Sequence, residues 1–191
     1  MTARKKAMEE LTKEMIVETA NRHFLLNDFH KVSMRAIAKE LGCSHGAIYY
    51  HFTNKNELFF AVVEKYFDEL NKKLDASIMN VANVEQKMME VFAGFIEFGL
   101  NHQSQYEFMF IMRNENTDPL NHQASKTSYM KFEETLQKIS ENELNSFEIY
   151  ATFMALHGFV SHYRGRVSNY LEASDDAKLF AQFLWKALDK K

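Results

Sequence analysis

The segment 32–52 constrains the fold of this chain more than any other stretch, because it holds two short apolar patterns separated by a glycine. In the first pattern, apolar residues recur at i, i+3, i+4 and i+7, which is the spacing of one face of a two-turn helix. These residues are Met34, Ile37, Ala38 and Leu41. Gly42 breaks the period and can adopt the positive φ that ends many helices. Beyond it, Ile48 and Phe52 form an apolar i, i+4 pair. Two short helices joined by a tight turn are typical of a helix-turn-helix.

A serine precedes each of these two helices. The hydroxyl groups of Ser33 and Ser44 can each accept a hydrogen bond from a free amide in the first turn that follows. Cys43, within the turn, is the only cysteine, so no intramolecular disulfide can form and a reducing cytosol is the expected compartment. We expect Cys43 to be a small buried side chain; a redox role is the alternative.

The remaining sequence also follows helical spacing. The chain of 191 residues is 46% hydrophobic and has one proline and six glycines, enough for one or two compact domains. No long stretch alternates with the period of two that marks a β-strand. The predicted fold class is therefore all-α. Capping motifs and apolar periods predict nine helices, at 12–26, 34–41, 45–51, 55–77, 84–102, 105–113, 119–140, 144–164 and 175–189.

Several helix starts carry a capping signal. Three pairs have the form of a capping box, in which the first residue accepts from the first turn and the second reaches back. The pairs are Asn54 with Glu57, Asn83 with Gln86, and Ser104 with Glu107. Asp118-Pro119 has the form of an N-cap followed by proline at the first helical position. The helix at 55–77 would link the helix-turn-helix to the rest of the chain.

Positive charge is concentrated around the helix-turn-helix. The whole chain has a formal net charge of −3 at pH 7, yet residues 1–55 contain nine Lys/Arg and six Asp/Glu. This local excess favours a nucleic-acid partner for the N-terminal part. Arg4, Lys5 and Lys6 could form an arm that reaches DNA, or a frayed terminus. Charged residues and not an apolar core follow them, so we expect no signal peptide.

The N-terminal part resembles the DNA-binding domain of the TetR family of bacterial repressors. The residues that carry the resemblance are Ser33-Met34-Arg35-Ala36-Ile37-Ala38, Leu41-Gly42, Ser44-x-Gly46-Ala47-Ile48-Tyr49 and His51-Phe52-x-x-Lys55-x-x-Leu58, with Ile16, Val17, Ala20, Phe24 and Phe29 upstream. The resemblance covers about residues 12–62. His23 stands at a position that the family usually fills with an apolar residue, and we expect it on the inner face of the first helix with Ile16, Ala20 and Phe24. The resemblance implies a DNA-binding domain at 1–53 and a helical effector-binding and dimerisation domain at 54–191.

The resemblance also implies a surface that contacts DNA. Its residues are Ser33, Arg35, Ser44, His45, Gly46, Ala47, Tyr49, Tyr50, His51 and Lys55. Gly46 would permit close approach, Ala47 can meet a thymine methyl group, and His45 can bond to a base edge. Arg35 would read a guanine or hold the backbone. The residues expected at phosphate and sugar are Tyr49, Tyr50, His51 and Lys55. One of the two tyrosines could instead pack inside the domain.

The segment 84–112 is crowded with methionine and phenylalanine. Such stripes usually form core, but 11 Met and 17 Phe in the chain exceed ordinary packing needs, and flexible methionines suit an adaptable cavity. Residues in this half are also similar to one type of TetR-family effector domain: Phe98, His102, Tyr106, Met109, Phe110, Leu156, His157 and Gly158. We therefore expect a small apolar or aromatic effector. The residues expected to bind it are Phe92, Phe95, Phe98, Met109, Phe110, Arg113, Phe153 and His157. For His157, the better expectation is a buried histidine bonded to a neighbour.

The last two helices carry more apolar residues than one inner face needs. These residues are Ala155, Phe159, Phe180, Ala181, Leu184, Trp185 and Leu188. Two protomers could bury them in a four-helix bundle, and the resemblance implies such a homodimer. The alternative is that they close the core of one protomer.

Together these features predict a dimeric regulator that binds double-stranded DNA, most simply a repressor released from a palindromic operator by its effector. An activator, an apolar-ligand carrier with a vestigial helix-turn-helix and a helical enzyme are the alternatives. The sequence has no glycine-rich phosphate loop, nucleophile elbow, Glu-x-x-His motif or dense metal-ligand cluster, so no enzyme, cofactor or metal site is predicted. The uncharged stretch 149–163 is too short to span a membrane.

Overall fold

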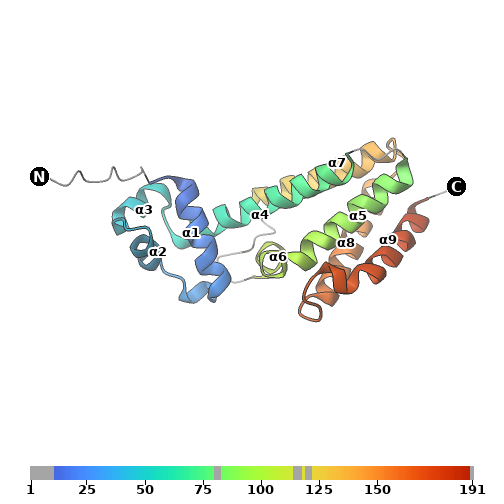
Figure 1. Ribbon diagram of the computed structural model, residues 1–191. Helices are drawn as coiled ribbons and strands as arrows, with labels where there is room; N and C mark the ends of the chain where they lie inside the picture. The colour runs from blue at the N-terminus through green and yellow to red at the C-terminus, as the bar shows by residue number, and fades with distance from the viewer. Residues whose placement is uncertain (1–10, 80–82, 114–117, 119–121, 190–191) are drawn as a thin grey trace, which may run out of the picture. The chain divides into compact units, whose positions relative to one another are not determined.

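The computed structural model describes residues 11–79, 83–113, 118 and 122–189 (Figure 1). These residues form nine α-helices and two short 3-10 helices and contain no β-strand, which confirms the predicted all-α class. The chain divides into two compact units, Met1–Val62 and Val63–Lys191. Helix α4 (Lys55–Ser77) contributes residues to both. Within the described ranges, no helix is long and apolar enough to cross a membrane.

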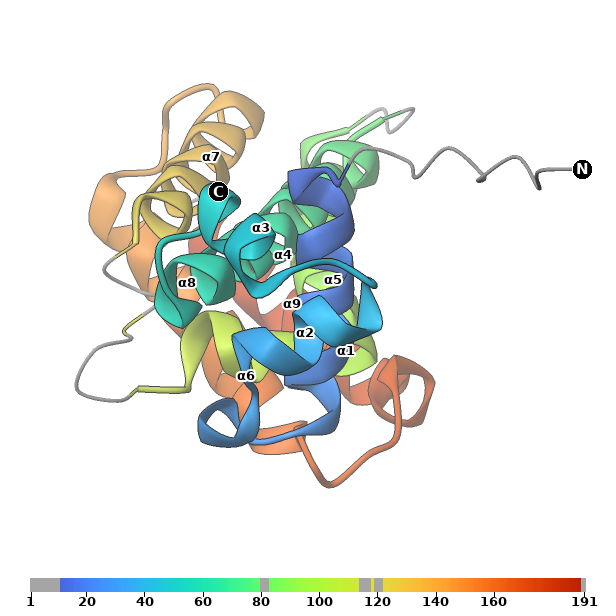
Figure 2. The same ribbon diagram turned by 90° about the vertical axis from the view of Figure 1, so that its left-hand side faces the viewer.

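The first unit is built on α1 (Lys13–Leu26), α2 (Met34–Glu40), α3 (His45–His51) and the first turns of α4 (Figure 2). The 3-10 helix η1 (Phe29–Lys31) connects α1 to α2. Three aromatic rings, those of Phe24, Phe29 and Phe59, meet in the core with centroids 5.1 to 5.8 Å apart. The fully buried residues around them are Ile16, Ala20, Ile37, Ile48 and Leu58.

The local signals for the helix-turn-helix are confirmed. The Ser33 hydroxyl accepts from the Ala36 amide at 3.1 Å, and the Ser44 hydroxyl accepts from the Ala47 amide at 3.1 Å. Gly42 has a φ of 66°, so the turn uses the conformation that glycine allows without strain. Two short helices are thereby capped and separated by sequence-local interactions alone.

Two expectations for the first unit are wrong. Cys43 is half-buried and not buried, because the turn that carries it lies at the surface beside exposed Gly42 and Ser44. His23 was expected on the inner face of α1, but the buried residues of this helix are Ile16, Thr19, Ala20 and Phe24. The His23 ring instead bonds to Glu40 of α2. The imidazole of His23 would lack a hydrogen-bond partner in the apolar core, and at the edge of the core it finds one in Glu40.

The second unit is organised around α5 (Val84–Asn101). This helix packs against α6 (Gln103–Phe110), α7 (Gln123–Ile139), α8 (Ser146–Tyr163) and α9 (Ser174–Leu188), and also against the 3-10 helix η3 (Tyr170–Ala173) (Figures 1 and 2). Buried residues occur on all sides of α5, as expected for a helix surrounded by others. Its fully buried residues include Met88, Val91, Phe92 and Ile96.

Gly99 of α5 lies in close contact with Val160 of α8. A Cβ built at this position would lie 2.5 and 2.9 Å from the two γ-methyl carbons of Val160. We expect Gly99→Ala to lower the free energy of unfolding by about 1–3 kcal/mol, because the two helices must separate to admit the methyl group. Thermal unfolding measures the change. Adding Val160→Ala removes the obstructing methyl groups, so the double variant should lose less than the two single variants together; simple additivity would contradict the close contact.

The helix starts agree with the sequence in part. The Asn54 and Asn83 side chains accept from the Glu57 and Gln86 amides, at 2.9 and 2.7 Å. The Glu57 carboxylate, however, bonds to the amide and hydroxyl of Thr53 and not to Asn54. α8 starts with a complete capping box, Asn145 with Glu148, which was not predicted.

The predicted capping box at Ser104 is wrong. α6 starts at Gln103 after His102, whose side chain makes no capping bond. Glu107, the second member of the predicted box, accepts instead from the Arg164 guanidinium at 2.8 Å. A long-range ion pair therefore takes the carboxylate that the local motif would have used. α6 also ends at Phe110, three residues before the predicted end.

The predicted start of the next helix lies partly outside the described residues. Residues 119–121, including the proline of the Asp118-Pro119 signal, are not described, and α7 runs over Gln123–Ile139 with His122 as its N-cap. The basic arm with Arg4, Lys5 and Lys6 also lies outside the described residues. The remaining helices match their predicted spans to within two residues, and α4 matches fully.

Candidate functional site

The second helix of the helix-turn-helix, α3, presents most of its side chains to solvent. Within α3 only Ile48 is buried, and Phe52 directly after the helix is buried as well. Tyr50 is 87% exposed and Tyr49 is 43% exposed, so neither tyrosine packs into the core. The alternative that one of the two tyrosines packs inside the unit is therefore wrong.

The aromatic side chains on α3 order one another. The His45 ring meets the Tyr49 ring edge-on with centroids 4.6 Å apart, and the Tyr50 and His51 rings are 5.3 Å apart. Each pair combines an imidazole with a phenol, so hydrogen-bond donors and acceptors stand on an exposed helix. Side chains of this kind can bond to phosphate oxygens and base edges.

Gly46 has no structural requirement for glycine. A Cβ at this position would meet only the Ser44 hydroxyl oxygen, at 3.9 Å, and its φ lies outside the positive range. Gly46 is exposed, and its neighbour Ala47 is half-buried. The first turn of α3 thus presents a small, nearly side-chain-free surface, next to the aromatic residues of the following turn.

The two DNA-binding candidates on α2 stand at its first turn. Ser33 is the N-cap, and both Ser33 and Arg35 are exposed. A DNA contact by either residue remains a prediction.

Lys55 has protein partners that the sequence did not reveal. Its ammonium group donates to the carbonyl oxygens of Phe29 at 2.9 Å and Val32 at 3.1 Å, and it lies 4.4 Å from the centroid of the Phe29 ring. Partial burial lowers the pKa of Lys55. The ammonium group thus satisfies the end of η1 and ties α4 to the segment before α2. A phosphate contact by Lys55 remains a prediction, and it would compete with these carbonyl groups.

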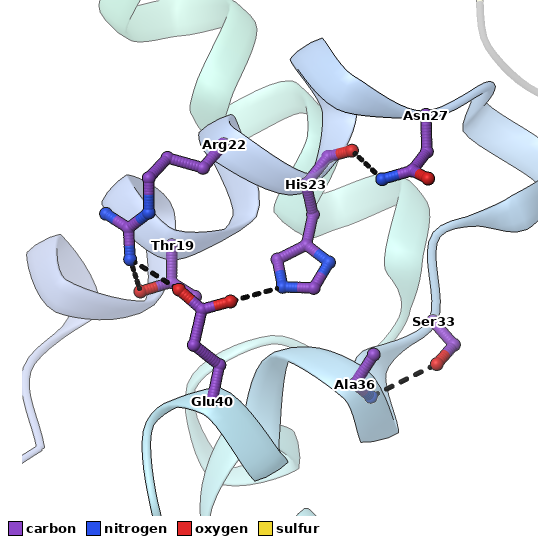
Figure 3. Close-up of polar contacts among 7 residues, drawn as sticks. All are labelled: Thr19, Arg22, His23, Asn27, Ser33, Ala36 and Glu40. Carbon is purple, nitrogen blue, oxygen red and sulfur yellow. Dashed lines mark hydrogen bonds and ion pairs between the residues drawn. The ribbon is translucent and has the colours of Figure 1, made fainter.

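A carboxylate joins α1 to α2 (Figure 3). One oxygen of Glu40 accepts from the Arg22 guanidinium at 2.7 Å, and the other lies 2.8 Å from Nε2 of His23. The same nitrogen of Arg22 also donates to the Thr19 hydroxyl at 3.1 Å. Hydrogen bonds from Arg22 and His23 lower the pKa of Glu40. The group remains ionised across the physiological range and links the last residue of α2 to α1.

The second unit contains an aromatic cavity of about 360 Å³. Residues from four helices, α4, α6, α7 and α8, surround it. They are Phe67, Phe110, Ser125, Lys126, Ser128, Tyr129, Met130, Tyr150, Phe153 and Met154. A volume of this order, with mainly apolar walls, suits a small organic ligand.

A larger groove of about 630 Å³ in the same unit has a different character. Charged residues line it, among them Lys73, Glu90, Glu97 and Asp175, and the Lys73 ammonium pairs with the Glu97 carboxylate at 2.6 Å. Transfer of an apolar molecule to such a polar groove gains less than transfer to the aromatic cavity. The aromatic cavity is therefore the better candidate for an apolar effector.

Phe153 connects the aromatic cavity to the core. Its ring centroid lies 5.3 Å from that of Tyr129 and 5.7 Å from those of Phe95 and Phe132. It also stacks on the His157 ring at 6.4 Å. The Phe153 ring also contacts the ring of Phe110 in α6. A ligand that displaces the Phe153 ring would therefore disturb its contacts with three other helices, α5, α6 and α7.

His157 forms a polar pair behind these rings. Its Nδ1 lies 2.6 Å from the hydroxyl oxygen of fully buried Tyr106, which confirms the expected bond to a neighbour. The expected burial of His157 is wrong, because its ring is only half-buried. Burial lowers the pKa of His157 and raises the pKa of Tyr106, so both groups are neutral at pH 7. The two neutral groups share one hydrogen bond between the Tyr106 hydroxyl and Nδ1 of His157.

The lowered pKa of His157 predicts a pH dependence of stability. The unfolded chain binds a proton at this residue more readily than the folded protein, so stability is full above the ordinary histidine pKa and falls as the solution is acidified. We expect the melting temperature to fall more between pH 7.5 and 5.5 in the wild type than in His157→Phe. The other seven histidines are common to both proteins. An equal fall in both would contradict the assignment.

The predicted ligand residues divide into two groups. Phe92, Phe95, Phe98 and Met109 are buried in the core of the second unit. Phe110 and Phe153 line the cavity, and His157 contacts the rings of both. Arg113 is exposed after the end of α6. The cavity residues that the sequence did not single out are Phe67 of α4 and residues of α7 and the first half of α8, such as Tyr129 and Tyr150. No local pattern in the sequence indicates that these residues face one another.

The predicted dimer residues are covered to different degrees. Ala181 and Leu184 are buried within the second unit, where α9 packs against α5. Ala155, Phe159, Phe180, Trp185 and Leu188 are half-buried, and the rings of Phe159 and Phe180 stack 5.0 Å apart. The exposed large apolar side chains of α8 and α9 are Phe147, Tyr150, Met154, Leu179 and Phe183.

Comparison with known families identifies the N-terminal unit. Residues 16–62 match the family model described as bacterial regulatory proteins, tetR family. This match covers the last turns of α1, the whole helix-turn-helix and the start of α4.

Comparison with individual proteins extends the similarity over the chain. An uncharacterized HTH-type transcriptional regulator YerO of Bacillus subtilis is 26% identical over 93% of this chain and 63% of its own length. The HTH-type transcriptional activator FasR of Mycolicibacterium smegmatis is 28% identical over 48% of this chain and 42% of its own length. The chain thus spans less than two thirds of the length of these relatives.

A solved structure shares the fold. The transcriptional regulator FadR from Bacillus subtilis, in complex with stearoyl-CoA, superposes with a TM-score of 0.64 over 94% of this chain and 98% of that one, at 14% sequence identity. At this identity the superposition shows a common fold.

Proposed function

We propose that this chain, which belongs to the TetR family of bacterial regulatory proteins, is a dimeric transcriptional regulator that binds operator DNA through α3 and releases it when a small effector binds. The observation that carries the proposal is α3 itself. Its two ends are fixed by the Ser44 cap and by buried Phe52, while its donors, acceptors and small residues face solvent. A helix with this exposure fits the major groove of B-DNA.

Two copies of α3 would read a palindromic operator. In a two-fold dimer, they would lie in successive major grooves about 34 Å apart. We assign base contacts to His45, Gly46 and Ala47, and backbone contacts to Tyr49, Tyr50 and His51. Arg35 and the two cap serines stand at the first turns of the two helices, where contacts to the DNA backbone fix the register.

The effector would occupy the aromatic cavity of the second unit. Its walls favour an apolar or aromatic molecule, and among the described residues that line it only Lys126 is charged. A long acyl compound is one such molecule, since a structural neighbour was solved in complex with stearoyl-CoA. Because α4 belongs to both units, a shift of its second half on effector binding would move the first unit. The loss of DNA affinity cannot exceed the difference in effector affinity between the two states.

Exposed apolar residues support the dimer. Leu179 and Phe183, four residues apart on one face of α9, are each 65% exposed, and Met154 of α8 is 46% exposed. Burial of such side chains against a second copy would remove apolar area from water and form a two-fold interface. We name Leu179 and Phe183 the α9 apolar face.

The proposal is tested by fluorescence anisotropy with duplex DNA from upstream of the gene and with DNA enriched by the protein from a random pool. A scrambled duplex is the control, and a salt series measures the number of phosphate contacts. Selective, salt-sensitive binding of two protomers per site is expected. Equal, weak binding to every duplex would contradict the proposal and favour the apolar-ligand carrier.

Gly46→Ala separates DNA contact from folding. The added methyl group meets no atom of the unit closer than 3.9 Å, so stability should stay the same or rise by about 0.5 kcal/mol. If α3 lies close to DNA at this residue, operator affinity should fall about tenfold or more, because one steric contact displaces the helix from the groove. Anisotropy titration measures the operator affinity, and thermal unfolding of the same preparation measures the stability. Unchanged affinity would remove Gly46 from the interface.

A further inference from the structure

We infer that Glu40 is a positioning residue for DNA recognition: through Arg22 and His23 it fixes α2 on α1, and thereby sets the orientation of α3. The inference rests on the proposed function, because it concerns the affinity of α3 for an operator. Neither Arg22 nor Glu40 belongs to the DNA-contacting surface, so the effect on binding would be indirect.

The orientation of α3 depends mainly on α2. α3 packs chiefly against α2, and α2 in turn packs against α1. Of its own seven residues, α3 buries only Ile48. A helix with a single buried side chain takes its orientation from the element that supports it, so a small rotation of α2 would be passed to α3.

α2 is held by a polar tie at each end. Before its first residue, the Lys55 ammonium group of α4 binds the carbonyl oxygens of Phe29 and Val32. At its last residue, the Glu40 carboxylate binds α1. The helix is only seven residues long and buries three of them. Without Glu40, its C-terminal end would be held by apolar packing, which permits rotation more readily than directed bonds do.

Two donors constrain the carboxylate from different directions. Each oxygen has its own partner, Arg22 at 2.7 Å and His23 at 2.8 Å (Figure 3). The guanidinium is itself held by Thr19, whose side chain is buried. A single exposed ion pair contributes little to stability, but a carboxylate with two ordered partners also fixes direction. The contribution to DNA affinity would therefore exceed the contribution to folding.

The first test compares Glu40→Gln with a matched control. Asp28 forms an exposed ion pair with Lys31 at 2.6 Å, three residues away, and this pair joins no two α-helices. Glu40→Gln and Asp28→Asn thus remove the same charge from the same unit. Anisotropy with the duplex that the wild-type protein enriches from a random pool should show about three- to tenfold weaker binding for Glu40→Gln, and less than about twofold for Asp28→Asn.

The second test uses charge exchange. Exchanging the pair, as Arg22→Glu with Glu40→Arg, should restore affinity to within about threefold of wild type. If the folded exchanged protein binds the duplex as weakly as Glu40→Gln does, the ion pair does not position α2.

The outcomes are distinct. If Glu40→Gln is folded by circular dichroism and binds within twofold of wild type, the inference is overturned. If it does not fold, the exchanged pair decides, and a folded Arg22→Glu, Glu40→Arg protein that binds more than tenfold more weakly than wild type overturns the inference. If the wild-type protein itself enriches no duplex, the proposed function fails, whatever Glu40 does.

Discussion

Leu179→Glu is expected to convert the dimer to a monomer and to weaken operator binding by about 100-fold or more. Leu179 is 65% exposed on the α9 apolar face, so the substitution leaves the core of the second unit intact. In the dimer, the new carboxylate would be buried against an apolar surface without a partner, which costs several kcal/mol. A monomer then binds one half-site and loses the gain from a linked second contact.

Sedimentation velocity and anisotropy together measure this change. The control is Leu171→Glu, the same substitution at a leucine of η3 that is 78% exposed and lies outside α8 and α9. It should leave both the oligomeric state and the affinity within about twofold of wild type. A dimer that persists in Leu179→Glu would show that another surface joins the protomers. Monomeric protein with full operator affinity would remove the dimer from the mechanism.

Phe153→Ala is expected to lower the free energy of unfolding by about 3–5 kcal/mol. The Phe153 ring meets those of Phe95, Tyr129 and Phe132 and stacks on His157, so its loss leaves a cavity between α5, α7 and α8. This is a large share of the stability of an ordinary domain. Phe153→Leu, which keeps most of the volume, should lose about 1–1.5 kcal/mol.

The same variant reports on the cavity as a ligand site. An apolar cavity of sufficient size binds small aromatic molecules, and a ligand that binds only the folded state raises the melting temperature. We expect indole to stabilise Phe153→Ala more than the wild type, measured by thermal unfolding over a concentration series. Equal shifts in the two proteins would place the binding site away from Phe153.

The secondary structure of this chain could be predicted from sequence because its signals are local. Ser33 and Ser44 cap helices with amides three residues away, and Gly42 adopts the conformation expected of it. α4 begins and ends where the apolar period and the Asn54 cap place it. Where a distant residue competed for a local partner, the prediction failed: Glu107 pairs with Arg164, 57 positions away, and not with its own helix start.

The roles of side chains depended on contacts between helices. The sequence predicted Lys55 as a phosphate ligand. In the structure, its ammonium group lies within hydrogen-bond distance of three backbone carbonyl oxygens. The sequence also predicted Ala181 and Leu184 as dimer residues. In the structure, α9 packs on α5 and buries these two residues, while Leu179 and Phe183 stay exposed. Both faces of α9 are apolar, so periodicity alone could not decide which one a second helix covers.

The sequence by itself determined the helices, most of their ends and the resemblance of the N-terminal unit to the TetR family, since capping, turn geometry and apolar spacing act within a few residues. The aromatic cavity and the bonds from Glu40 to Arg22 and His23 became visible only in the tertiary structure. These features join residues 17 or more positions apart, and their formation depends on how helices pack. No local pattern in the chain encodes that packing, because the same apolar face can bury itself against several partners.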